Sequence, residues 1–249
     1  MNSRAKRVYK VGGPALEDPR LVAPLAKEIG EFDGDIALVH GGGRQVERML
    51  KQLGIESKFI EGRRETSPAA MEIVEMVLSG SMNPALASGL SRAGVEAVGI
   101  SGRSGNLIRA SLVPGLGQVG SPDRVDPRIL EGLWAAKFIP VVSPVSNDAS
   151  GQAVNVNADE VAQSIARQVG AETLVFLSDV DGVILDGASV THLTEADLGV
   201  RIADGSIHGG MAMKVRMALD AARSGIPTVI IAGRARLEGG FPGTRISLN

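Results

Sequence analysis

Two lysines in this sequence occupy positions that need an anion nearby. Lys10 interrupts the apolar run "RVYKV", and two glycines, Gly12 and Gly13, follow that run. Lys214 comes soon after the start of a helix that the apolar spacing of "GGMAMKVRMALDAARSG" predicts from about Met211, so we expect it in the first turn. A buried lysine and a cation at a helix N-terminus are both unfavourable unless a negative group offsets them. The alternatives are an exposed edge strand for Lys10 and a solvated side chain for Lys214.

A glycine-rich loop offers an anion a second kind of partner. The motif "HGGGR", residues 40–44, lies between a strand-like apolar run and a helix predicted at about 44–53. Its glycines let the backbone approach a ligand closely, and the following helix presents N–H groups that have no partner within the helix. The loop is therefore a candidate anion site.

The acidic segment "NVNADE" could hold the lysines in place. Asn157 is a good helix N-cap, and Glu160 three residues later would complete a capping box, so local structure alone accounts for these two residues. It does not account for Asn155 and Asp159. Because an acid near two lysines could fix their positions, Asp159 is a candidate for that role.

Two further segments are candidate ligand contacts. "GRRET" places Arg63 and Arg64 before a helix predicted at about 67–79, and a planar guanidinium can bind a carboxylate through two hydrogen bonds. "SDVDGVILDG", residues 178–187, follows the apolar run "TLVFL" and so falls at the carboxyl edge of a parallel sheet, where ligands bind. Solvated arginines and ordinary turns are the alternative explanations.

Short β-branched runs that alternate with helical patterns predict an open α/β fold with a mostly parallel sheet. The strand-like runs are "RVYKV", "DIALVH", "EAVGI", "IPVVSPV", "ETLVFLSDV" and "PTVIIAG". Helices are expected at about 21–32 and 44–53, and residues 107–120 predict a hairpin or small lid. No linker marks a boundary, so we expect a single domain over 1–249 whose two lobes divide near Ala171.

Composition excludes several classes of function. The 249 residues carry 26 Lys and Arg against 28 Asp and Glu, a formal charge of −2, so no nucleic-acid or membrane partner is expected. Cysteine is absent, and the three histidines lack metal-ligand spacing, so neither thiolate chemistry nor a zinc site is expected. "GLGQVG" matches a dinucleotide fingerprint, but the helix-breaking "SPDRVDP" follows it, and no P-loop motif occurs. The sequence has no signal peptide or membrane span, which favours a soluble cytoplasmic protein.

Nine motifs, taken in order, resemble those of the N-acetylglutamate kinases in the amino acid kinase family. They are "KVGG", "VHGGGRQVERML", "GRRET", "GQVGSP", "PVVSP", "VNVNADEVA", "FLSDVDGV", "GGMAMKV" and "GTR", and they span essentially the whole chain. The resemblance implies an αβα sandwich and ATP-dependent phosphoryl transfer, with Mg²⁺, to the side-chain carboxylate of N-acetyl-L-glutamate. The product would be N-acetyl-L-glutamyl 5-phosphate, in arginine biosynthesis. The lobe at about 1–170 would bind this substrate and the lobe at about 171–249 would bind ATP.

The resemblance also implies roles for the residues that match. Lys10 and Lys214 would be the cations on the transferring phosphoryl group, with Asp159 as the organiser between them. Backbone N–H groups of Gly12, Gly13, Gly42 and Gly43 would surround the phosphoryl group and the substrate, and Arg64 and Asn155 would also bind the substrate. The nucleotide would lie against Asp179, Val180, Asp181, Gly182, Val183, Ile184, Ser206, Ile207, His208, Gly209, Gly210 and Met211. No protein side chain is expected to bind a metal ion.

This allocation agrees with the chemistry that the chain can offer. An acceptor carboxylate with a pKa of about 4.3 is ionised at neutral pH, so the transfer needs no general base. Cations and N–H groups can then bind the charge of the phosphoryl group. One departure is "GRRET" where these kinases usually have "GLRVT", which changes the charge on both sides of Arg64.

The resemblance leaves the assembly and the acceptor to be tested. Arginine-inhibited, hexameric members carry an N-terminal helix, whereas only a short segment precedes Lys10, so a homodimer is expected. The alternatives to a free-acetylglutamate kinase are a kinase for aminoadipate or glutamate attached to a carrier protein, and a relative that binds a metabolite without catalysis.

Overall fold

The fold is built around an eight-stranded sheet. The computed structural model describes residues 4–12, 19–60 and 62–249. The strands lie in the order β14-β16-β15-β11-β1-β2-β8-β5, and every neighbouring pair is parallel except β15 with β16. Their bounds are β1 Lys6–Val11, β2 Asp35–His40, β5 Ala97–Ser101, β8 Ile139–Ser143, β11 Thr173–Leu177, β14 His192–Thr194, β15 Thr228–Ala232 and β16 Thr244–Ser247. The predicted α/β class with a mostly parallel sheet is confirmed.

β1 lies in the middle of this sheet, and its place decides the environment of Lys10. The strand pairs along its length with β2 on one side and with β11 on the other, and Lys10 is level with Val39 and Phe176. An exposed edge is therefore excluded for Lys10. Because parallel strands end at the same edge of a sheet, the segments that follow β1, β2 and β11 meet there.

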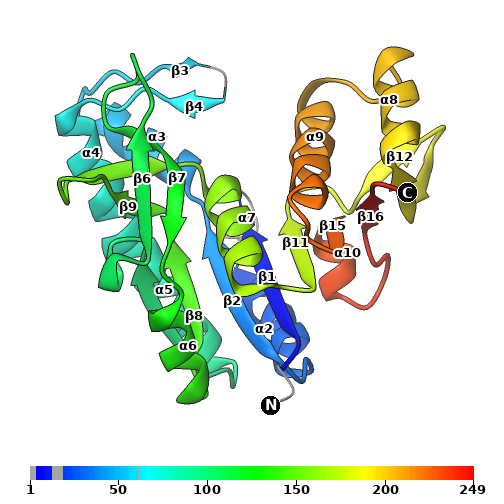
Figure 1. Cartoon of the computed structure of the whole chain (residues 1–249), viewed down its shortest axis with the longest axis horizontal. Coiled ribbons are helices and arrows are strands. Elements are labelled where there is room, and N and C mark those ends of the chain that lie inside the picture. The colour runs from blue at the N-terminus through cyan, green and yellow to red at the C-terminus, as the bar shows by residue number, and fades with distance from the viewer. Residues whose placement is uncertain (1–3, 13–18, 61) are drawn as a thin grey trace.

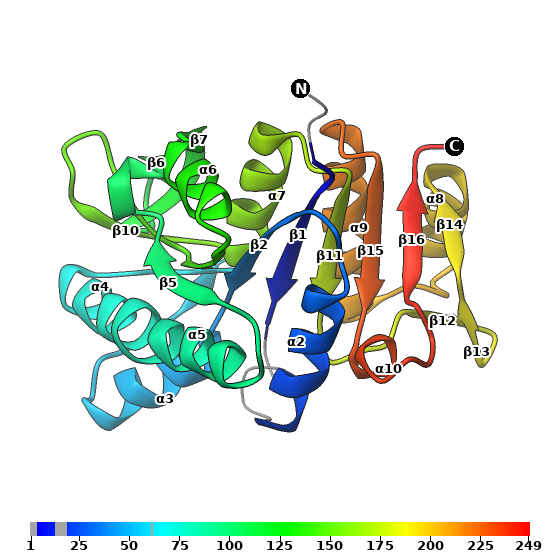
Figure 2. The same ribbon diagram turned by 90° about the horizontal axis from the view of Figure 1, so that it is seen from below.

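Helices cover both faces of the sheet (Figures 1 and 2). On one face α2 (Val22–Gly30) and α5 (Asn83–Arg92) pack against β1 residues such as Tyr9, and on the other face α7 (Ala158–Val169) packs against Val8. Since alternate residues of a strand point to opposite faces, Lys10 shares the α7 face with Val8. The other helices are α3 Gly43–Gln52, α4 Pro68–Glu75, α6 Arg128–Ala135, α8 Glu195–Ala203, α9 Gly209–Arg223 and α10 Arg234–Leu237.

Shorter strands form hairpins and a small barrel beside the large sheet. β6 and β7 are antiparallel, so the hairpin predicted over 107–120 is present, and the two strands close a barrel with β9 and β10. β3 and β4 form a second, very short hairpin, and β12 pairs with β13. The bounds are β3 Phe59–Ile60, β4 Arg63–Arg64, β6 Ile108–Leu112, β7 Val119–Val125, β9 Val145–Asn147, β10 Ala153–Val156, β12 Val183–Leu185 and β13 Ala188–Val190.

The helix predicted at about 67–79 continues further than its sequence pattern suggests. The Ser67 side chain accepts a hydrogen bond from the Ala70 N–H and caps α4. A π-helical segment, Met76–Met82, then joins α4 to α5, so helical backbone extends to Arg92. The apolar spacing of an α-helix has a period of 3.6 residues, so a π-helical turn interrupts the pattern on which the prediction rests.

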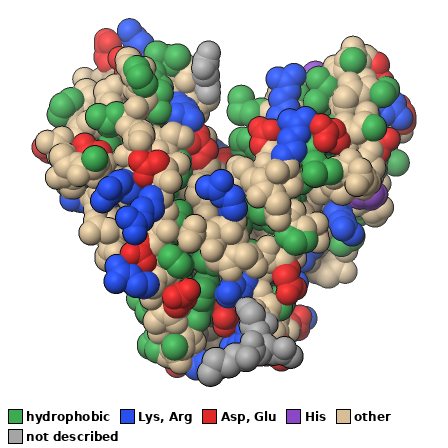
Figure 3. All heavy atoms as spheres, in the orientation of Figure 1, with side chains coloured by type: hydrophobic (Ala, Val, Ile, Leu, Met, Phe, Trp, Pro, Cys, Tyr) green, Lys and Arg blue, Asp and Glu red, His purple; other side chains and the backbone are tan. Residues whose placement is uncertain are grey.

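A cleft separates the N-terminal part (residues up to 170) from the C-terminal part (171–249) at the top of Figure 3. Below the cleft the sheet continues through both parts, because β11 pairs with β1. The division into two lobes near Ala171 thus remains a prediction. None of the helices in the described ranges combines the length and the apolar composition that crossing a membrane requires.

Candidate active site

Lys10 forms an ion pair with Asp159, the acid expected to organise it. Lys10 Nζ lies 2.9 Å from Asp159 Oδ1, and the two side chains are 17% and 19% exposed. Asp159 lies in the first turn of α7, where the Asn157 side chain accepts a hydrogen bond from the Asp159 N–H. A Cβ on Gly12 would lie 2.6 Å from Lys10 Nζ, so glycine at this position leaves the space that the ammonium group occupies.

Lys214 lies in the second turn of α9, so the predicted first-turn position is wrong. The helix begins at Gly209, with His208 as its N-cap, rather than near Met211. Glycines add no apolar side chain to a helical pattern, which is why the pattern starts two residues late. Lys214 still has the negative partner that its position predicts, because its Nζ lies 2.5 Å from Asp179 Oδ1.

Asp179, and not Asp159, is therefore the carboxylate that contacts Lys214. This differs from the arrangement expected from the resemblance, in which Asp159 stands between both lysines. The hydrogen bond from Lys214 is the main cause that lowers the pKa of Asp179, and the charge of Lys10 acts in the same direction. Two ion pairs, Lys10 with Asp159 and Lys214 with Asp179, thus lie where β1, β11, α7 and α9 converge, near enough for the charge of Lys10 to act on Asp179.

The N-terminus of α3 brings amide groups to the same edge of the sheet. Gly42 is the N-cap of α3 and Gly43 is its first residue. Neither of their N–H groups donates a hydrogen bond to an acceptor within the described ranges. The Gly12 N–H, in contrast, donates to the Leu177 carbonyl oxygen at 3.3 Å. Gly42 and Gly43 are thus the better placed of these three predicted residues to bind an anion, and the fourth, Gly13, lies outside the described residues.

His40 supports this loop as a buried, neutral side chain. Its Nδ1 lies 2.8 Å from the Gly41 carbonyl oxygen, and its Nε2 lies 3.0 Å from Asn83 Nδ2. A carbonyl oxygen only accepts and an amide nitrogen only donates, so the network assigns the proton to Nδ1. Burial lowers the pKa of His40 to about 4. The histidine therefore orders the loop and carries no charge at neutral pH.

A cavity of about 220 Å³ brings most of the predicted substrate-binding residues together. Its lining includes Lys10, Gly12, Gly42, Gly43, Arg64, Asn155 and Asp159. Asn155 Nδ2 donates to Thr66 Oγ1 at 3.1 Å, which orients the amide. A lining of this kind, with cations, a carboxamide and helix N–H groups that have no acceptor among the described residues, suits a small anionic ligand.

Arg64 reaches this cavity from a buried position, so the alternative of a solvated side chain is excluded for it. The residue is 6% exposed. Its guanidinium donates to Glu47, to Ser57 Oγ and, at 3.0 Å, to the Gly43 carbonyl oxygen, and it lies 4.4 Å from the centroid of the Phe59 ring. These contacts tie β4 to the first turns of α3 and fix one wall of the cavity.

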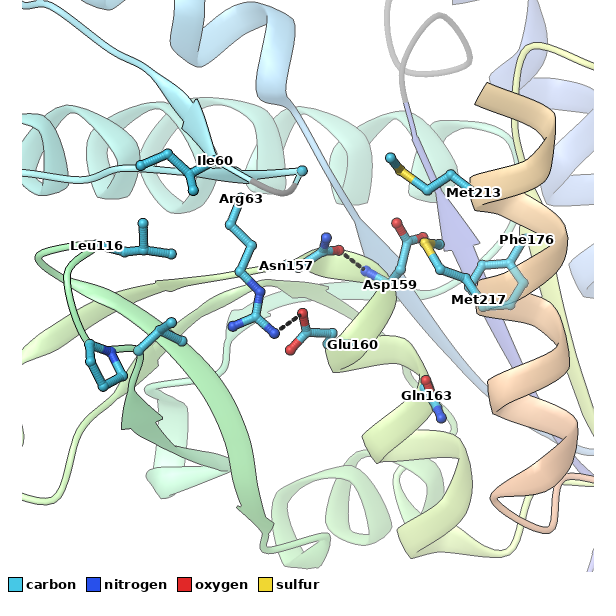
Figure 4. Close-up of a pocket in the computed structure, with 13 residues that line it drawn as sticks. Ile60, Arg63, Leu116, Asn157, Asp159, Glu160, Gln163, Phe176, Met213 and Met217 are labelled. Carbon is cyan, nitrogen blue, oxygen red and sulfur yellow. Dashed lines mark hydrogen bonds and ion pairs between the residues drawn. The ribbon is translucent and has the colours of Figure 1, made fainter. Parts of the chain in front are cut away.

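A larger cavity, of about 690 Å³, lies between the two parts of the chain (Figure 4). Asp159 and Asn157 line both cavities. In Figure 4 Arg63 extends from β4 toward Glu160 of α7, and Met213 and Met217 of α9 lie on the opposite side of the cavity. The two cavities together connect the candidate acceptor site to the helix that carries Lys214.

The pairing of Arg63 with Glu160 was missed by the sequence interpretation. Arg63 Nη2 lies 2.8 Å from Glu160 Oε1, and the Ser121 hydroxyl donates to Glu160 Oε2 at 2.9 Å. Glu160 is thus engaged by tertiary partners, and the predicted capping box is replaced by the Asn157 cap alone. The unusual "GRRET" sequence was the available signal, but a local pattern cannot name a partner almost one hundred residues away.

The residues expected to bind the nucleotide form two segments of the C-terminal part. One follows β11 and the other leads into α9, and the ion pair of Lys214 with Asp179 connects them. Within the first segment, Asp181 Oδ1 accepts from the Ala235 N–H at 2.7 Å, and the Val183 N–H donates to Thr244 Oγ1 at 2.8 Å. These two residues stabilise the loop, and their contact with a nucleotide remains a prediction. Across the described ranges no three His, Cys, Asp or Glu side chains are grouped as a metal site would require.

Known proteins match this chain over nearly its whole length. The profile of the amino acid kinase family matches residues 5–232. The chain belongs to the amino acid kinase family. Its relative acetylglutamate kinase from Rubrobacter xylanophilus is 44% identical over 247 residues, which cover 96% of this chain and 94% of that protein.

Solved structures agree on the amino acid kinase fold. The smu.665 protein of Streptococcus mutans aligns with a TM-score of 0.81 at 23% identity, over 98% of this chain and 99% of that one. Carbamate kinase from Giardia lamblia bound to AMP-PNP aligns with a TM-score of 0.70 at 16% identity, over the full length of both chains. At these identities the likeness concerns the fold alone.

Proposed function

We propose that this amino acid kinase family member transfers the γ-phosphoryl group of ATP to the side-chain carboxylate of N-acetyl-L-glutamate. Two observations carry the proposal. The ion pair of Lys10 with Asp159 lies near that of Lys214 with Asp179, and Lys10, Asp159, Gly42 and Gly43 line one cavity of about 220 Å³. Relatives named acetylglutamate kinase, 39–44% identical over 96% of this chain, support the choice of acceptor. The reaction would be the second step of arginine biosynthesis.

The charges of the site suit this transfer. An oxygen of the acceptor carboxylate forms a bond to the γ-phosphorus, and the bond from that phosphorus to the bridging oxygen of ADP breaks. The acceptor is already ionised, so no proton has to move, and no general base is needed. Lys10, Lys214 and the N–H groups at the start of α3 would bind the charge on the phosphoryl oxygens, while Asp159 holds Lys10 in position.

The nucleotide is placed on the C-terminal part by this proposal. Its binding residues would be Asp179, Val180, Asp181, Gly182, Val183, Ile184, Ser206, Ile207, His208, Gly209, Gly210 and Met211. Mg²⁺ would arrive with ATP as part of that substrate and bind the phosphates. The Giardia lamblia carbamate kinase bound to AMP-PNP supports nucleotide binding by this fold.

One assay tests the reaction and the acceptor together. ADP release is measured with Mg²⁺-ATP and, in turn, N-acetyl-L-glutamate, glutamate, aspartate and N-acetylaminoadipate, and hydroxylamine traps the acyl phosphate. Turnover confined to N-acetyl-L-glutamate is expected. No turnover with any of the four would contradict the proposal and favour a carrier-bound acceptor or a non-catalytic binder.

We also propose that the protein is a homodimer in the cytoplasm. β5 ends the large sheet of the described residues, so its outer edge offers backbone groups for pairing with a second copy. Light scattering after size-exclusion chromatography would give a mass near twice 25.8 kDa if this is correct, and a mass near 25.8 kDa would contradict it.

A further inference from the structure

The β3–β4 hairpin, of which the structure describes residues 59–60 and 62–64, forms part of the wall of both cavities. Gly62 and Arg63 contribute to the lining of the 220 Å³ cavity and to that of the 690 Å³ cavity. The hairpin therefore lies between the proposed acceptor site and the cleft through which water can enter. The position of the hairpin therefore decides how well the acceptor site is separated from the water in the cleft.

Packing alone holds this hairpin weakly. Each strand has only two residues, and a hairpin of this size is marginal in water without other support. Phe59 and Ile60 of β3 are 59% and 45% exposed, so little apolar surface is buried. At the Arg64 end the buried guanidinium contacts supply an anchor, but they lie toward α3 and not toward α7.

The Arg63–Glu160 ion pair supplies the missing attachment on the α7 side. Its nitrogen and oxygen lie 2.8 Å apart, and the Ser121 hydroxyl holds the other carboxylate oxygen of Glu160. Glu160 directly follows Asp159 in the first turn of α7. The pair thus links the hairpin to the turn that carries the carboxylate partner of Lys10.

The tip of the hairpin also reaches the helix that carries Lys214. A Cβ on Gly62 would lie 3.8 Å from Sδ and Cε of Met213, which directly precedes Lys214. With Arg63 attached to α7 and Gly62 next to α9, the hairpin spans the gap between the helix that carries Asp159, the partner of Lys10, and the helix that carries Lys214.

We infer that Arg63 and Glu160 are positioning residues that hold the hairpin over the phosphoryl group during transfer and keep water away from it. The inference rests on the proposed function. Neither side chain touches the reacting atoms. When the pair is broken, water competes with the acceptor carboxylate for the γ-phosphorus. A water oxygen then bonds to the γ-phosphorus as the bond to ADP breaks, which gives ADP, inorganic phosphate and a proton.

The decisive measurement is the ratio of ADP formed to acyl phosphate trapped. Both side chains are just over a quarter exposed, so we expect the ratio and the KM for the acceptor to rise about two- to fivefold in Arg63→Gln and in Glu160→Gln. The exchanged pair, Arg63→Glu with Glu160→Arg, should recover much of the loss. Asp126→Asn is the matched control, because it breaks an ion pair of 2.7 Å with the exposed Arg128, away from both cavities.

A second measurement tests the attachment of the hairpin without depending on the proposed reaction. Hydrogen exchange of the backbone amides at 58–66 should speed up in both single variants and return toward the parent rate in the exchanged pair. Parent values for the ratio, the KM and the exchange rate in both variants would overturn the inference. If the parent traps no acyl phosphate at all, the proposed function fails instead, while faster exchange in the variants would still support the attachment of the hairpin by this pair.

Discussion

Lys10 is held for its proposed task by a carboxylate on one side and by the absence of a side chain at Gly12 on the other. Removing the ammonium group takes away a charge that the transition state needs more than the ground state does. We predict that Lys10→Ala lowers kcat by at least about 10²- to 10³-fold and leaves the folded state intact. Steady-state kinetics and circular dichroism test this, with Lys6→Ala on the same strand as the control. Activity within tenfold of the parent would contradict the role of Lys10.

Burial of the neutral His40 side chain should make the stability of the protein depend on pH. The pKa of His40 is about 4 in the folded protein against about 6.5 when unfolded, so the unfolded state takes up the proton first as the pH falls. Stability is full above pH 6.5 and decreases between pH 6.5 and 4, by roughly 3 kcal/mol in total from this residue. Urea unfolding at pH 7 and at pH 4.5 measures the effect. His40→Gln should show a smaller decrease than the parent, whereas the exposed His192→Gln should match it; equal decreases in all three would contradict the prediction.

At the scale of elements, the residue that follows β1, Gly12, leaves space for the Lys10 ammonium group. A methyl group there would lie 2.6 Å from Lys10 Nζ, the far end of a flexible side chain that can move away. Gly12→Ala should therefore reduce kcat by about tenfold or more by displacing the ammonium group, with little change in the free energy of unfolding. Gly132→Ala in α6, where an added Cβ meets nothing within 4 Å, is the control. A parental kcat with reduced stability would contradict this account.

Six strands of the large sheet and the glycine loop could be predicted from sequence, because period and composition are local properties. The short strands β14 and β16 were not among the predicted runs. Three further features could not be predicted. The π-helical segment interrupts the helical period, the start of α9 falls on glycines that carry no pattern, and the partners of Lys214 and Glu160 are set by tertiary contacts. Asp159 was found because helix capping did not account for it, whereas Glu160 was overlooked because helix capping did.

At the scale of the whole molecule, the contacts that join the described N-terminal and C-terminal parts away from the cleft include two of different kinds. The first is the pairing of β1 with β11. The second connects α2 to α10, where Arg236 Nε lies 2.7 Å from Glu28 Oε1 and the two side chains are 17% and 15% exposed. Tyr9 donates its hydroxyl hydrogen to the same carboxylate at 2.8 Å, and burial raises the pKa of Tyr9 to about 12, so it remains a donor at neutral pH. In Figure 1 both α2 and α10 lie in the lower half, below the cleft of Figure 3.

The contact of Glu28 with Arg236 and Tyr9 should contribute measurably to the stability of the protein. Glu28→Gln keeps the shape of the side chain but removes the charge that two largely buried donors, on Arg236 and Tyr9, require. The free energy of unfolding should fall by about 1–3 kcal/mol, measured by urea denaturation. Glu31→Gln at the C-cap of the same helix is the matched control, because Glu31 is 68% exposed and pairs with Lys27 only at 3.9 Å, so its loss should be below about 0.5 kcal/mol. If both variants unfold like the parent, the contact of Glu28 with Arg236 and Tyr9 contributes nothing measurable to stability, which would contradict the prediction. If only Glu28→Gln is destabilised, the contact of α2 with α10 stabilises the protein together with the pairing of β1 with β11. The distance between Lys10 and Lys214 then depends on both contacts.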